Sequence, residues 1–256
     1  MPHSCSTQSF YLNVLLVPTL SQTLSKRQRR NDELNIKPQF TPLHPHAVHI
    51  VNRFTNTHLL HDLIQIAQRT EHFSIDTESD MYTNRPALIQ IECIGQHRST
   101  VILVEMRHLP ADEKGLVFWL IRSLLKFVLE PRKTIYSWSD ARRELTRFTS
   151  CGLFSADTIQ QLHCVDVQHK FKQWHDSLGM VDPLRRPQWA LQAAIAFAFD
   201  QFLDKSETMN TWSRGLQQRS TATDRDQQKV QSMIRYAVND CLAVTKLVDL
   251  ILNELA

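Results

Sequence analysis

Residues 73–78 (FSIDTE) constrain the fold more than any other stretch, because a pattern typical of a buried strand ends there in two acidic residues. Apolar and polar residues alternate along it, which is the period of a β-strand. Asp76 and Glu78 are two residues apart and therefore project from one face. Two adjacent carboxylates repel each other and are costly to desolvate, so the pair must be solvated, protonated or bridged by a cation. A divalent metal site and a solvated strand end are the two interpretations of this stretch alone.

The composition limits the class of protein. With 256 residues and 42% hydrophobic content, the chain is long enough for one sizeable core, so we expect one domain. A net charge of only +3 means that a polyanionic partner must be bound by a local basic patch. Five widely spaced cysteines without a CxxC pair argue against a disulfide framework and favour an intracellular location, nuclear or cytoplasmic. The apolar stretch near the start is interrupted by Asn13 and Pro18 and is short, so we expect no membrane anchor.

Residues 1–45 are rich in Ser, Thr, Gln and Pro and lack a sustained period, which predicts a flexible tail ahead of a domain at 46–256. The tail carries a basic cluster at residues 26–30 (KRQRR). This cluster is compatible with a nuclear signal, a nucleic-acid contact or simply a solvated segment. The lack of acidic residues before Asp32 also permits an organelle-import signal.

The remaining chain predicts alternating strands and helices. Strands are expected at residues 47–51, 73–78, 86–92, 101–105 and 133–138, and another element begins at 164. Helices are expected after a capping signal at 55–57, over 111–129, from Asp140, over 189–202 and over 228–252. Strands first, followed by alternating helices and strands, indicate an α/β domain with a mixed β-sheet flanked by helices.

A second motif stands near the C-terminus, in the sequence RYAVNDCL of residues 235–242. Tyr236 and Asp240 are four residues apart on an expected helix and therefore share one face. Alone, they are more typical of a buried tyrosine beside a capping or salt-bridged aspartate. Together, the DTE strand and the YAxxD helix resemble the DnaQ-like 3′→5′ exonucleases, in the tyrosine subgroup that includes ribonuclease D and the Werner-type exonucleases.

Other segments agree with this resemblance in order and spacing. LIQI at residues 88–91 resembles the second strand of the family, and LDKS at 203–206, NTW at 210–212 and RGL at 214–216 resemble the segment before its last motif. The likeness extends from about Ala47 to the end of the chain. It implies a ribonuclease H-like fold and a 3′→5′ exonuclease that hydrolyses phosphodiester bonds of RNA or single-stranded DNA.

The resemblance also implies a site that holds two divalent ions, Mg²⁺ or Mn²⁺. Asp76 would contact both ions, Glu78 and Asp240 would complete the first, and Tyr236 would orient the attacking water. The family places an aspartate on the helix after a central strand, and both Asp140 and Glu144 are candidates for that position. Asp140 has the usual side chain, whereas Glu144 has the better distance from the strand.

Several basic and aromatic residues are candidates for binding the nucleic-acid strand. They are Arg142, Arg143, Lys170 and Lys205, with Arg147 and Lys172 as further cations and Trp138 or Trp174 as stacking platforms. A zinc site at His163, His169 and His175 is disfavoured because no paired cysteine ligands accompany them. The main alternative is a catalytically weak or inactive module of the same fold that binds nucleic acid or protein, and a domain detached from a larger polypeptide or mobile element is a third.

Overall fold

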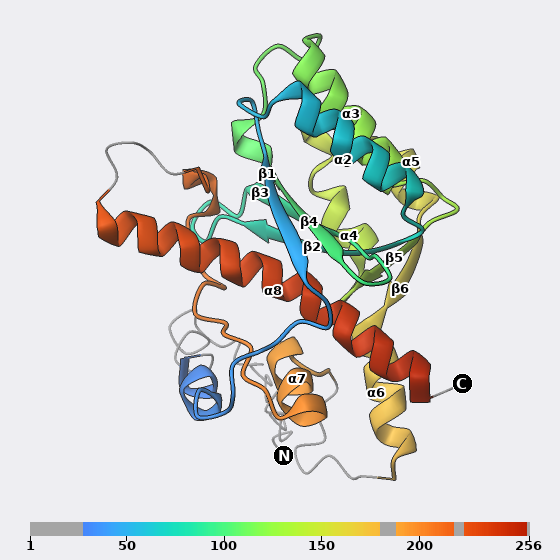
Figure 1. The fold of residues 1–256 in the computed structure, drawn as a ribbon, viewed down its shortest axis with the longest axis vertical. Coiled ribbons are helices and arrows are strands. Elements are labelled where there is room, and N and C mark those ends of the chain that lie inside the picture. The colour runs from blue at the N-terminus through green and yellow to red at the C-terminus, as the bar shows by residue number, and fades with distance from the viewer. Residues whose placement is uncertain (1–27, 180–187, 218–222, 255–256) are drawn as a thin grey trace, which may run out of the picture.

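The computed structural model describes residues 28–179, 188–217 and 223–254. Within these residues six strands form one mixed sheet in the order β1-β4-β3-β2-β5-β6, which confirms the predicted fold class (Figure 1). The strands are β1 (His46–Val51), β2 (His72–Ser79), β3 (Pro86–Cys93), β4 (Ser99–Glu105), β5 (Thr134–Ser137) and β6 (His163–Asp166).

One strand of the sheet runs against all the others. β3 is antiparallel to both of its neighbours, β2 and β4, whereas β1 is parallel to β4, and β2, β5 and β6 are parallel to one another. The carboxyl ends of the other five strands therefore lie along one edge of the sheet. This edge is the usual location of ligand sites in open α/β sheets.

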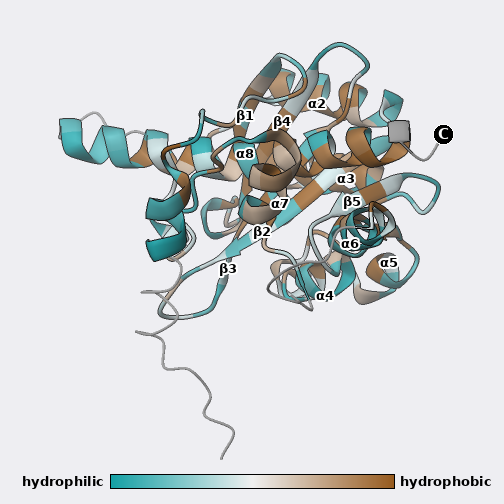
Figure 2. Cartoon of the chain, turned by 90° about the horizontal axis from the view of Figure 1, so that it is seen from below, coloured by the Kyte–Doolittle hydropathy of each residue, from teal (hydrophilic) through white to brown (hydrophobic). Residues whose placement is uncertain are grey.

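Helices cover both faces of the sheet (Figure 1). On one face lie α2 (Thr57–Arg69) and α3 (Leu116–Val128), and on the other lies the long α8 (Asp224–Glu254). Strand residues alternate between the two cores: Ile89 packs with α2 and α3, whereas Leu88 packs with α8. The first turns of α8 extend beyond the sheet and are polar, as the colouring of Figure 2 shows.

Shorter elements complete the domain at the ends of the strands. They are α4 (Ala141–Thr146), α5 (Ala156–Gln160), α6 (Val167–Ser177) and α7 (Leu191–Phe199), with 3-10 turns η1 (Met106–His108), η2 (Thr149–Cys151) and η3 (Trp212–Arg214). No helix in the described part of the chain combines the length and apolarity needed to cross a membrane.

Two predicted helices are shorter than expected, for local reasons. The helix predicted from residue 111 begins at Leu116, because the backbone N–H of Gly115 bonds to the carbonyl of Asp112 in a preceding turn. The helix predicted to end at residue 202 ends at Phe199, because Asp200 adopts the left-handed conformation with φ of 54°. Conversely, the last helix begins at Asp224, four residues before the expected start.

The prediction of a flexible tail was wrong for residues 28–45. Residues 1–27, which include Lys26 and Arg27 of the basic cluster, lie outside the described residues. Phe40 is buried in the core beside α8, and its N–H donates to the carbonyl of Phe202. The Asn31 side chain bonds to Asp204, to Gln192 and to the backbone N–H of Lys205. These contacts are made with residues far along the chain, so the local sequence carries no period that indicates them.

Candidate active site

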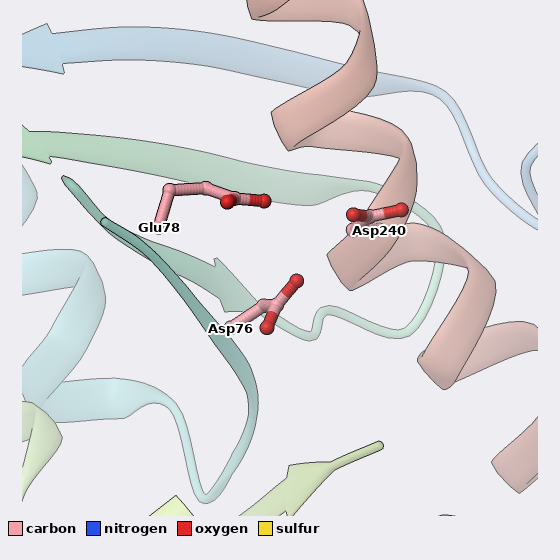
Figure 3. Close-up of side chains that lie close together, drawn as sticks. All are labelled: Asp76, Glu78 and Asp240. Atoms are coloured by element: carbon pink, nitrogen blue, oxygen red, sulfur yellow. The ribbon is translucent and has the colours of Figure 1, made fainter. Parts of the chain in front are cut away.

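Three carboxylates from two distant parts of the chain converge at the carboxyl end of β2. One oxygen each from Asp76, Glu78 and Asp240 lies within 4.8 Å of the others (Figure 3). Asp76 and Glu78 are half-buried and Asp240 is buried. Asp76 and Glu78 of the strand and Asp240 of the helix therefore lie together in space, as expected.

The strand and the helix are held together directly beneath this cluster. Asp76 and Glu78 project from the face of β2 that α8 covers, together with Ser74. The hydroxyl of Ser74 donates to the carbonyl of Cys241 at 3.1 Å, which fixes the turn of α8 that carries Asp240. The pairing of β2 with β3 shifts register immediately after Glu78, so the regular strand ends at the site.

The three carboxylates disfavour one another's ionisation. Burial, followed by the charges of Asp240 and Glu144, raises the pKa of Asp76 from 3.8 to about 7. Burial and the charge of Asp76 raise the pKa of Glu78 well above its usual range, and burial also raises the pKa of Asp240. A cluster of buried oxygen donors with mutual repulsion suits a hard divalent cation, so the residues present fit Mg²⁺ or Mn²⁺.

A lysine partly neutralises this cluster. The ammonium group of Lys205 donates to both carboxylate oxygens of Asp240, at 2.7 and 2.6 Å, and lies 4.5 Å from the ring centroid of Tyr236. We expected Lys205 to contact the nucleic acid; in the structure its ammonium group pairs with a site carboxylate. The LDKS segment indicated that this lysine matters, but only the fold shows that its partner is Asp240.

Tyr236 lies one turn before Asp240 on α8 and is buried. Its hydroxyl is 3.1 Å from the hydroxyl of Thr208, and its ring lies 5.7 Å from that of Trp212. Burial, with the charges of Asp240 and Glu78, raises the pKa of Tyr236 well above its usual value. The phenol therefore keeps its proton at neutral pH and is available as a hydrogen-bond donor.

Asp140 and Glu144, the two candidates for the middle acid, have different environments. Asp140 is exposed and caps α4, accepting a hydrogen bond from the N–H of Arg143 at 3.2 Å. Glu144 is half-buried, accepts a hydrogen bond from the hydroxyl of Ser139 at 2.6 Å, and its charge raises the pKa of both Asp76 and Glu78. Glu144 therefore acts electrostatically on the cluster, although it lies outside the group of three oxygens within 4.8 Å.

Two of the basic residues expected to bind nucleic acid make contacts within the fold. Arg142 donates to the carbonyl of Leu162 and so ties α4 to the start of β6. Arg147 donates to the backbone and side-chain oxygens of Asn84 at 2.8 and 2.7 Å. These guanidinium groups support the rim of the sheet.

The other expected cations lie on the surface. Arg143 on α4 and Lys170 on α6 are exposed. Lys172 on α6 is half-buried and forms an ion pair with Asp176, one turn later, at 2.5 Å. Arg143 and Lys170 are accordingly placed where a polyanion can reach them.

Of the two tryptophans expected to stack on bases, Trp174 is buried in the core and Trp138 is partly buried against it. Trp174 is 7% exposed, so its use as a stacking platform was a wrong prediction. Trp138 packs against the same cluster, and its indole N–H donates to the carbonyl of Trp189 at 3.0 Å. Both rings contact Phe171, which is fully buried. The mixture of basic and aromatic residues on α6 reflects one polar and one buried helix face.

Comparisons with known proteins agree with this fold. A family model described as 3′–5′ exonuclease matches residues 51–256. A search of curated protein sequences found no match. Among solved structures, the EXO domain of Nibbler from Aedes aegypti is similar, with 14% identity and a TM-score of 0.58 over 84% of this chain and 93% of that domain.

A second similar structure is RNase D from Trypanosoma brucei in complex with RNA U12. It is 15% identical, with a TM-score of 0.52 over 87% of this chain and 65% of that protein. This chain thus spans less than two thirds of that relative, and likenesses at such identities show the fold alone. The match of the family model over most of the chain shows the family: the protein belongs to the 3′–5′ exonucleases.

Proposed function

We propose that this protein is a metal-dependent exonuclease that hydrolyses phosphodiester bonds from the 3′ end of RNA or single-stranded DNA. The observation that carries the proposal is the convergence of Asp76, Glu78 and Asp240 within 4.8 Å, at the carboxyl edge of the sheet. Family membership supports the reaction class. The raised pKa values of these carboxyl groups support a cation site, because a divalent ion would relieve their repulsion.

Four acidic residues would hold the ions. Asp76, Glu78 and Asp240 supply the converging oxygens, and Glu144 is assigned as the middle acid because its charge acts on Asp76 whereas Asp140 caps a helix. Two bound Mg²⁺ or Mn²⁺ ions would supply charge neutralisation at the phosphate and activation of water at neutral pH.

The neighbouring side chains have separate tasks. The Tyr236 hydroxyl, held by Thr208 and protonated at neutral pH, orients the attacking water by a hydrogen bond. The Lys205 ammonium offsets the charge of Asp240 and favours the ionised form of this carboxylate in its buried position. Arg143 and Lys170, both exposed, attract the phosphates of the strand.

The test uses purified protein with strands of RNA and of DNA, labelled separately at the 3′ and the 5′ end. Addition of Mg²⁺ or Mn²⁺ should release the 3′ label first and shorten the 5′-labelled strand stepwise, and EDTA should stop both. Asp76→Asn should abolish the reaction, whereas Asp62→Asn, at an exposed position of α2, is the matched control.

One observation favours the alternative of a weak or inactive nucleic-acid-binding module. The middle acid is a glutamate that is bonded to Ser139 and lies outside the group of three close carboxylates. If the wild-type protein binds strands but neither ion produces shortening from the 3′ end, catalysis is refuted and the binding module is the better assignment.

A further inference from the structure

A hollow lies on the same edge of the sheet as the carboxylates. It is a cavity of about 360 Å³ at the carboxyl ends of β1 and β4, and its lining includes Arg53, Phe54, Glu105, His108 and Arg214. A cavity of this size is within the range of small-ligand sites. None of its residues belongs to the catalytic site described above.

The register of the strands places this cavity relative to the catalytic site. Glu105 at the end of β4 pairs with Leu88 of β3, and Leu88 pairs with Glu78 of β2. Two strand spacings therefore separate Glu105 from Glu78, which is roughly 10 Å. The two sites are close enough for separate nucleotides of one strand to occupy both.

The wall of the cavity is closely packed. Gly215 has φ of +89°, and a β-carbon at this position would lie 2.8 Å from Nε2 of His108. The buried Glu105 accepts hydrogen bonds from the backbone N–H of Leu216 at 2.5 Å and from the side chain of Asn52 at 2.7 Å. These donors offset the one negative charge in the lining, and the bonds fix the loop of η3 against the sheet.

The open side of the cavity presents a cation and an aromatic ring. Arg53 is exposed, and its guanidinium carbon lies 4.6 Å from the ring centroid of Phe54, which is 64% exposed. Arg214, which also lines the cavity, is partly neutralised by Asp226 at 3.2 Å. An exposed ring beside an arginine is a surface on which a nucleobase stacks while the cation meets a phosphate.

We infer that this cavity binds an upstream nucleotide of the substrate strand, with its phosphate on Arg53 and its base on Phe54. The inference rests on the proposed exonuclease function and adds a second contact on the 5′ side of the hydrolysed bond. Such a contact increases affinity for strands long enough to reach from the carboxylates to the cavity and contributes less for a dinucleotide.

The test measures binding of fluorescent single strands of graded length to Asp76→Asn protein, which does not consume them. Arg53→Ala should weaken binding of the longer strands and reduce the slope of log affinity against log salt by about 0.7, the value for one phosphate contact on a single strand. Phe54→Ala should weaken binding about 10-fold and leave the salt slope unchanged, because stacking releases no counterion. Both losses should be smaller for a dinucleotide.

Arg69→Ala is the matched control, since Arg69 is exposed at the opposite end of α2. If Arg53→Ala and Phe54→Ala bind every length as Arg69→Ala does, while wild-type protein shortens strands, the inference is overturned and the exonuclease proposal stands. If the wild-type protein neither binds nor shortens any strand, the proposed function fails, and the inference fails with it. Thermal unfolding of each variant confirms that these exposed substitutions leave the fold intact.

Discussion

Replacing Asp76 by Asn is expected to stabilise the metal-free protein at neutral pH while abolishing its metal binding. The carboxylate of Asp76 lies beside those of Glu78 and Asp240, and burial, followed by the charges of Asp240 and Glu144, raises its pKa to about 7. The folded state therefore binds the proton of Asp76 more tightly than the unfolded chain does. Asparagine keeps the shape of the side chain but carries no charge, so the folded variant avoids this cost.

The magnitude follows from the difference between the ordinary pKa of 3.8 and the raised value of about 7. At 1.36 kcal/mol for each pH unit, ionisation of Asp76 costs the folded state up to about 4 kcal/mol. The stability of the metal-free wild type should fall as the pH rises from about 4 to about 7, because the folded state holds more protons in that window. The stability of Asp76→Asn should not show this part of the decrease with pH. Near pH 8 its free energy of unfolding should therefore exceed that of the wild type by about 2–4 kcal/mol.

The assay is denaturant unfolding in EDTA at several pH values from about 4 to about 8, followed by the same series with Mg²⁺ or Mn²⁺. A divalent ion at about 100 times its Kd should stabilise the wild type by about 2.7 kcal/mol and the variant much less. The control, Asp62→Asn, alters an exposed carboxylate of α2 and should change neither series.

Two results would refute the reasoning. Equal stability of variant and wild type at every pH would mean that neither burial nor the neighbouring carboxylates raise the pKa of Asp76 in the folded protein. Equal stabilisation of both by the divalent ion would mean that the ion binds elsewhere.

Three further predictions concern the middle acid, the tyrosine and the N-terminal segment. Glu144→Gln should abolish metal-dependent cleavage in the labelled-strand assay. Asp140→Ala should retain cleavage and lower the free energy of unfolding by about 1 kcal/mol, because it removes the cap of α4. If Asp140→Ala abolishes cleavage and Glu144→Gln does not, Asp140 belongs to the site. Tyr236→Phe should reduce kcat about 10²-fold with unchanged ion binding by calorimetry, and an unaltered kcat would exclude a role for the hydroxyl. A chain that begins at residue 46 should have a lower free energy of unfolding in denaturant than one that begins at residue 28. The difference should be at least roughly 2 kcal/mol, the contribution of burying Phe40. Equal stability would show that segment 28–45 is dispensable.

The sequence determined the elements and the chemistry of the site. The alternation in residues 73–78 placed Asp76 and Glu78 on one face of a strand, and the spacing of Tyr236 and Asp240 placed them on one face of a helix. These are local consequences of strand and helix periods, so a single sequence is enough to read them. The mixed sheet followed from the order of the elements.

Other features were decided only by contacts between distant residues. The sequence alone does not distinguish Asp140 from Glu144 as the middle acid, because they are one turn apart; the start of α4 determines that Asp140 caps the helix while Glu144 acts on the strand acids. The ion pair of Lys205 with Asp240 joins two segments with no local relation.

The burial of Trp174 and the docking of residues 28–45 are also decided by contacts between distant residues. Residues of similar composition are exposed in one fold and buried in another, because burial depends on the surface that another element presents. For Phe40 that surface is formed by α8 and the segment around Phe202, more than 150 residues later. The periods of strands and helices act over a few residues and are fixed by the sequence, whereas the partners that close a core or complete a charged site are fixed only when the chain packs.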